Sequence, residues 1–142
     1  MTKNEELVTI MHTQTDLMEA LVHSLTGMQQ ALVHSDAKAL SDFTKEEQAL
    51  LVPIQQLDQE RVACVKALAG EVCHVETLLK FVPVEERPAV KTVSDRMRKT
   101  TERIVTLNRQ NMLLIRSAHR FAQEMLRIIT NDHQRKLVDE RM

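Results

Sequence analysis

Residues 90–129 read VKTVSDRMRKTTERIVTLNRQNMLLIRSAHRFAQEMLRII, and this stretch decides the fold. Its apolar residues recur mostly at steps of three and four, the heptad pattern of a helix that packs along one side. Thr100 and Asn111 are the polar members of the series. The pattern predicts one helix over about residues 84–131, with its apolar stripe at Val90, Val93, Met97, Ile104, Leu107, Leu114, Ala118, Phe121, Met125 and Ile128.

Two other long helices are predicted before it, over about residues 4–34 and 36–69, each with its own heptad stripe. Ser35 and Asp36 offer an N-cap between them, and so short a link predicts an antiparallel hairpin. Pro53 lies inside the second stripe and should kink or divide that helix, because proline lacks a backbone donor. A short helix is expected over 72–82, and a frayed polar tail over 132–142.

The composition agrees with this reading. The 142 residues include two Gly, three Pro and no Trp or Tyr, which favours helix–helix packing over strands. A chain of this length forms one domain with a modest core. We therefore expect residues 1–142 to form a single all-α domain: an antiparallel bundle of three long helices plus one short helix, with coiled-coil-like heptad packing.

The predicted helices differ in length. The last would span roughly 65–70 Å, against about 45–50 Å for each arm of the hairpin. Part of its apolar stripe then has no partner within the chain, and an open stripe should recruit a second copy or a foreign helix. The C-terminal third of the last helix is where we expect a partner to bind.

Charge and cysteine usage narrow the function classes. The formal net charge is −1, which predicts no nucleic-acid partner, and no apolar run is long enough for stable membrane insertion. The N-terminus lacks the pattern of a secretion signal. Cys64 and Cys73 are the only cysteines and are expected to be reduced thiols in a cytosolic protein. The charge is uneven, because residues 1–70 carry five Lys or Arg against ten Asp or Glu.

The six histidines do not form a metal motif, because none pairs with another at the i, i+4 spacing that zinc ligands on a helix need. No catalytic motif is recognisable either. One alternative stays open. His23 to Gly27 resembles the His-x-x-x-Gly core of histidine phosphotransfer domains, in which an exposed His accepts a phosphoryl group. Thr26 stands where that family usually has Lys.

Three stretches together resemble the FlgN-type flagellar export chaperones. Residues 30–40 are similar to that family's junction between its first two helices. Residues 45–61, KEEQALLVPIQQLDQER, are similar to its Leu-rich second helix, which ends on acidic residues and Arg61. Residues 107–114, LNRQNMLL, resemble its Leu-Asn-x-x-Asn-x-Leu-Leu stretch, matched here by Leu107, Asn108 and Asn111.

The resemblance implies a bacterial cytoplasmic chaperone of the flagellar type III export system that needs no cofactor and catalyses no reaction. Its partners would be the C-terminal helical segments of hook-associated (hook–filament junction) proteins, and the flagellar export apparatus. The family's cargo contacts, carried over to this chain, would be Leu114, Ala118, Phe121, Met125, Ile128 and Ile129, flanked by Arg120 and Arg127. A third possibility is a structural coiled-coil protein that forms a homodimer and leaves no groove open.

Overall fold

The computed structural model describes the backbone of residues 1–141 and the side chains of residues 1–136. These residues form helices and turns, with no strand among them. The elements are α1 (Lys3–Val33), α2 (Ala37–Ala69), α3 (Val75–Leu78), the 3-10 turns η1 (Leu79–Phe81) and η2 (Val84–Glu86), and α4 (Arg87–Arg141). The prediction of an all-α helical bundle is confirmed.

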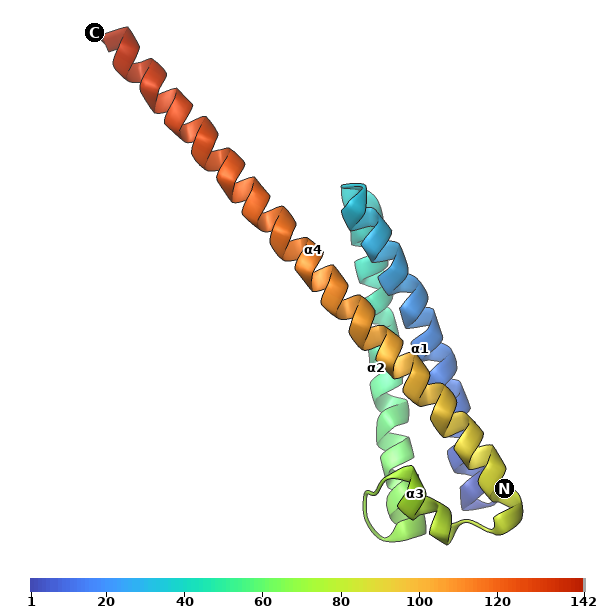
Figure 1. The fold of residues 1–142 in the computed structure, drawn as a ribbon. Coiled ribbons are helices and arrows are strands. Elements are labelled where there is room, and N and C mark those ends of the chain that lie inside the picture. Colours follow the sequence, from blue (N-terminus) through green and yellow to red (C-terminus); the bar gives the residue numbers. More distant parts are fainter. Residues whose placement is uncertain (142) are drawn as a thin grey trace.

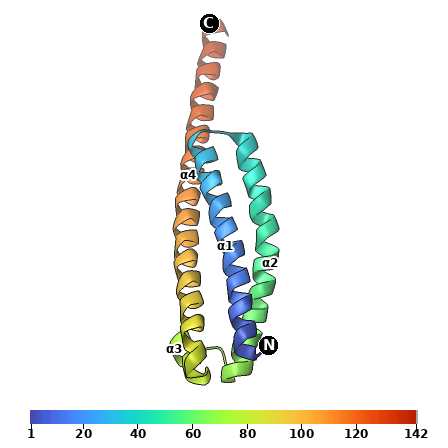
Figure 2. The same ribbon diagram turned by 90° about the vertical axis from the view of Figure 1, so that its right-hand side faces the viewer.

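The three long helices run up, down and up (Figure 1). α2 is therefore antiparallel to α1, whereas α4 runs parallel to it. α1 packs along both of the other helices, while α2 and α4 make few contacts with each other. Figure 2 shows α1 between its two neighbours. The molecule is thus built around α1.

The sequence of α1 explains this central place. Thr2 and Glu5 form a capping box, in which the Thr2 hydroxyl accepts from the Glu5 N–H at 3.2 Å. Beyond the cap, the heptad stripe and the residues beside it are buried, because one helix neighbour covers each side. The buried apolar residues of α1 are Leu7, Ile10, Met11, Met18, Leu21, Val22, Leu25, Met28 and Ala31.

α2 begins and ends where the sequence predicts. The Asp36 carboxylate caps its N-terminus by accepting from the Ala39 N–H at 3.0 Å. Gly70 ends it in the left-handed conformation at φ 83°, which glycine adopts without steric cost. Pro53 lies within the helix and does not divide it.

The connection from α2 to α4 differs from the prediction. In place of a helix over 72–82, the chain forms one α turn, Val75–Leu78, followed by the two 3-10 turns. His74, at the N-cap of α3, makes no side-chain capping bond, so its first N–H groups lack that stabilisation. Leu78 and Val82 are nevertheless buried in the core at this end, which fixes the connection by packing.

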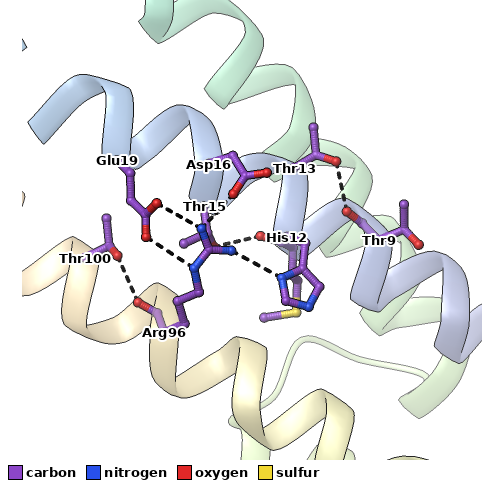
Figure 3. A network of polar contacts seen from close by, with 9 residues as sticks. Thr9, His12, Thr13, Thr15, Asp16, Glu19, Arg96 and Thr100 are labelled. Atoms are coloured by element: carbon purple, nitrogen blue, oxygen red, sulfur yellow. Dashed lines mark hydrogen bonds and ion pairs between the residues drawn. The ribbon is translucent and has the colours of Figure 1, made fainter. Parts of the chain in front are cut away.

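A polar cluster holds α4 against α1 (Figure 3). The Arg96 guanidinium reaches from α4 to the carboxylates of Asp16 at 2.6 Å and Glu19 at 2.9 Å, and donates to His12 Nδ1 at 3.2 Å. The hydrogen bonds that Arg96 donates to Glu19 and Asp16 raise its pKa above the usual value. One side chain with three partners on α1 helps to set how far along α1 the last helix sits.

α4 is longer than predicted. It has 55 residues and continues through residues 132–141, so the expected end near residue 131 and the frayed tail are wrong for that stretch. Met142 lies outside the described residues. At about 1.5 Å per residue, α4 is roughly 80 Å long, against about 46 Å for the 31 residues of α1.

Candidate binding surface on the last helix

The last helix leaves the bundle about halfway along its length. The contacts between α1 and α4 end near Asn111, whose Nδ2 donates to the Leu25 carbonyl at 2.9 Å, and Gln110, which pairs with Gln29 at 2.9 Å. Beyond Leu114, which is half-buried, every residue from 115 to 136 is exposed. Figure 1 shows α4 diverging from the α1–α2 hairpin, with its C-terminal end projecting past the end of the hairpin. We call residues 114–136 the overhang.

The overhang carries the same apolar stripe as the packed half of α4. In the bundle that stripe is buried against α1, with Val90 and Val93 fully covered and Leu107 nearly so. In the overhang the side chains of Phe121, at 64% exposed, and Ile128, at 51%, have nothing over them. We call these continuing positions the first stripe: Leu114, Ala118, Phe121, Met125 and Ile128.

A second line of apolar residues lies beside the first. Its members follow at steps of seven, four and three and are all exposed, with Leu126 at 64%. We call this the second stripe: Ile115, Ala122, Leu126 and Ile129. Of these, only Ile129 was expected from the sequence.

The arginines lie elsewhere on α4. At about 100° per residue, Arg116, Arg120 and Arg127 fall within roughly 40° of one another, on the side opposite the middle of the two stripes. We expected Arg120 and Arg127 to flank the apolar positions. At these angles they form a basic back face instead. An interface on the apolar side would leave them in solvent.

The comparisons with known proteins agree with the geometry. The family described as FlgN protein matches residues 1–138. The chain belongs to the FlgN family. This is a family of flagellar chaperones, so the match indicates binding of flagellar proteins in general. No curated protein and no solved structure was significantly similar to the chain.

The FlgN-like motif residues have distinct structural places. Asn111 is 2% exposed and lies on the seam between α1 and α4, where its amide bonds to the α1 backbone. Leu107 is buried one heptad before Leu114, whereas Asn108 is exposed. Arg61 is on α2, where it pairs with Asp58 at 2.9 Å. Of the motif residues on α4, Leu107 and Asn111 are the buried ones, and they lie just before the overhang, where α4 leaves α1.

A groove between α2 and α4 was not predicted. α1 forms its floor with Gln14 and Met18, and Met97 and Thr101 form its α4 wall. Gln14 is 4% exposed; its Nε2 donates to Asp58 on the α2 wall at 3.2 Å, while its Oε1 accepts no hydrogen bond among the described residues. The groove is visible only in three dimensions, because it depends on α2 and α4 standing apart.

His23 is exposed on α1, as a phosphoryl acceptor would be. Gly27, however, does not clear space beside it. A Cβ at Gly27 would overlap the Phe43 ring of α2, so the residue is small because an aromatic side chain packs on it. The family match and this contact together explain the His-x-x-x-Gly sequence without phosphotransfer.

The described residues offer neither a metal-binding cluster nor a membrane-spanning helix. No group of three His, Cys, Asp or Glu side chains among them is placed to hold a metal ion. None of the helices in this part of the chain combines the length and apolar character that crossing a membrane requires.

Proposed function

We propose that this member of the FlgN family is a bacterial cytoplasmic export chaperone of the flagellar type III secretion system. It binds the C-terminal helical segments of hook-associated proteins along the overhang and delivers them to the export apparatus. Binding and release are its whole activity, with no cofactor and no chemical step.

One observation carries the proposal: the stripe that packs against α1 continues for several turns beyond the last hydrogen bonds between α1 and α4, at Gln110 and Asn111. Large exposed apolar side chains in an unbroken line are unusual on a protein surface and mark interaction sites. A partner helix laid along the first stripe would make the contacts that α1 makes lower down. Fully burying each Leu, Ile, Phe or Met side chain stabilises the complex by about 1.5–3 kcal/mol before the cost of association.

Such a surface also suits release. The interaction is a row of similar apolar contacts on one rod, with no enclosed pocket, so a bound segment can be stripped off from one end. The apolar contacts are modest in number, and the entropy cost of ordering the cargo segment offsets part of their free energy. The resulting affinity is one that an export machine can reverse.

The test replaces Phe121 and Met125 together by Asp, which puts two charges in the middle of the first stripe. Affinity for the purified C-terminal region of a hook-associated protein from the same bacterium is measured by calorimetry. We expect at least a tenfold loss, about 1.4 kcal/mol, because each carboxylate would be desolvated on binding.

The matched control is Leu113→Asp with Gln123→Asp. It adds the same charge at two exposed positions away from both stripes and should change affinity less than about threefold, well under 1.4 kcal/mol. Circular dichroism reports whether both variants keep their helix. If the folded Phe121→Asp/Met125→Asp variant binds as tightly as the unmodified chain, the proposed site is wrong.

A further inference from the structure

The apolar surface of the overhang is wider than one partner helix needs. At about 100° per residue, the first and second stripes together cover roughly 160° of the helix circumference. A seam between two helices uses two positions per heptad, a narrower band. The second stripe is therefore left over after a single helix has bound the first.

Within the bundle, the width of a helix's buried surface can be compared with the number of helices packed against it. α1 has two neighbours and buries side chains across a broad arc, including Thr15 and Ser24 beside its heptad stripe. α2 has one main neighbour, and only Cys64 and Val65 are buried along its 33 residues. In this chain, the width of the covered surface follows the number of helices packed on it. The overhang has the width that goes with two.

The second stripe also lies on a particular side of α4. Thr101 lies two heptads before Ile115, and Met97 lies 18 residues before it, about five full turns. Both line the α4 wall of the groove between α2 and α4. The second stripe thus continues the side of α4 that faces this groove, as the first stripe continues the side that faces α1.

We infer that the overhang binds a helical hairpin, two antiparallel amphipathic segments of one partner chain. One segment lies on the first stripe, in line with α1, and the other lies on the second stripe, in line with the groove. The inference rests on the proposed function and specifies the form of the cargo.

The experiment compares three full-length double variants. Phe121→Asp/Met125→Asp disables the first stripe, Ile115→Asp/Leu126→Asp disables the second, and Leu113→Asp/Gln123→Asp is the control for charge. Each is tested against the C-terminal region of a hook-associated protein and against the two halves of that region as separate peptides. Circular dichroism confirms the helix content, and light scattering gives the mass of each chain alone.

We expect both stripe variants to lose at least about tenfold in affinity for the whole region, while the control loses less than about threefold. Each half should bind more weakly than the whole and respond to one stripe only. If the second-stripe variant binds like the control while the first-stripe variant loses affinity, a single helix is bound; the hairpin is then overturned and the proposed function stands.

Two other outcomes would also overturn the hairpin. If neither stripe variant loses affinity, the proposed site fails, and the hairpin with it. If the chain alone is a dimer that both stripe variants dissociate, and cargo affinity follows neither stripe, a second copy covers the apolar surface. That result also overturns the hairpin.

Discussion

Gly27 and Phe43 meet where α1 packs against α2, and their contact decides what the His23 motif means. The ring of Phe43 lies where a side chain at position 27 would begin. A side chain at position 27 would require the half-buried ring of Phe43 to move, so this packing accounts for the glycine without a phosphoryl donor beside His23. A sequence motif of two residues is matched easily by chance when one of them is a close-packed glycine.

This contact predicts that the effect of Gly27→Ala on the free energy of unfolding changes sign with the residue at position 43. Gly27→Ala should destabilise the chain by about 1–3 kcal/mol through overpacking against Phe43, although alanine is the better helix former by about 1 kcal/mol. In a Phe43→Leu background, which opens space, the same substitution should become neutral or stabilising. Urea denaturation of the four chains measures the coupling. Equal effects of Gly27→Ala in both backgrounds would contradict the packing explanation.

Single positions on α4 show that heptad periodicity predicts which side of a helix a residue faces. The sequence placed Asn111 on the seam of the last helix, and the structure buries it there against the α1 backbone. Arg120 and Arg127 were expected, from the family resemblance, to flank the binding positions, and their angle on the helix instead places them on the back face. Counting turns from Phe121 would have put both on the back face.

At the scale of elements, one polar link joins α1 to α2 beneath the groove. Asp58 accepts from Arg61 at 2.9 Å and from the buried Gln14 at 3.2 Å. The hydrogen bond from Arg61 lowers the pKa of Asp58, with the bond from Gln14 adding to it and burial opposing it. The ionised form is therefore favoured in the folded chain.

The lowered pKa of Asp58 determines how its contribution to stability changes with pH. The pKa of Asp58 is lower in the folded chain than its ordinary value of 3.8, so its stabilising contribution is present above about pH 4 and is lost as pH falls through the folded pKa. Asp58→Asn should lower the urea midpoint slightly at pH 7, and the difference from the unmodified chain should shrink below pH 4. A difference that stays constant down to about pH 3 would show that Asp58 does not act through its charge.

The elements also show where prediction from sequence stops. Heptad stripes located α1, α2 and most of α4, because each helix packs periodic apolar residues against a neighbour, buried or partly buried. They misjudged residues 72–82, where buried Leu78 and Val82 belong to turns rather than to a helix. They also missed the second stripe, since Ile115 and Leu126 match no single seam and gain meaning only when the free end of α4 is seen.

At the scale of the whole molecule, the bundle and the overhang are separable. Residues 115–136 bury none of their side chains in the rest of the described chain. Removing residues 119–142 should therefore leave the midpoint of thermal unfolding within about 3 °C, while the helix signal falls in proportion to the residues lost. The truncated chain should not retain the hook-associated protein in a pull-down.

The control for this truncation is the full-length chain under the same conditions, monitored by calorimetry and circular dichroism. A large fall in the midpoint would mean that the overhang stabilises the bundle, and would undermine its description as a free surface. Retention of the cargo by the truncated chain would instead place the binding surface within the bundle.

The independence of the overhang has a consequence for how the protein can change over generations. Most substitutions in a protein are filtered by their effect on stability, and this limits how quickly a binding surface can be altered. The exposed positions of α4 from Ile115 to Lys136 escape that filter as long as they remain good helix formers. New cargo preferences can then accumulate there by single substitutions, and a library randomised at these positions should yield folded variants at high frequency.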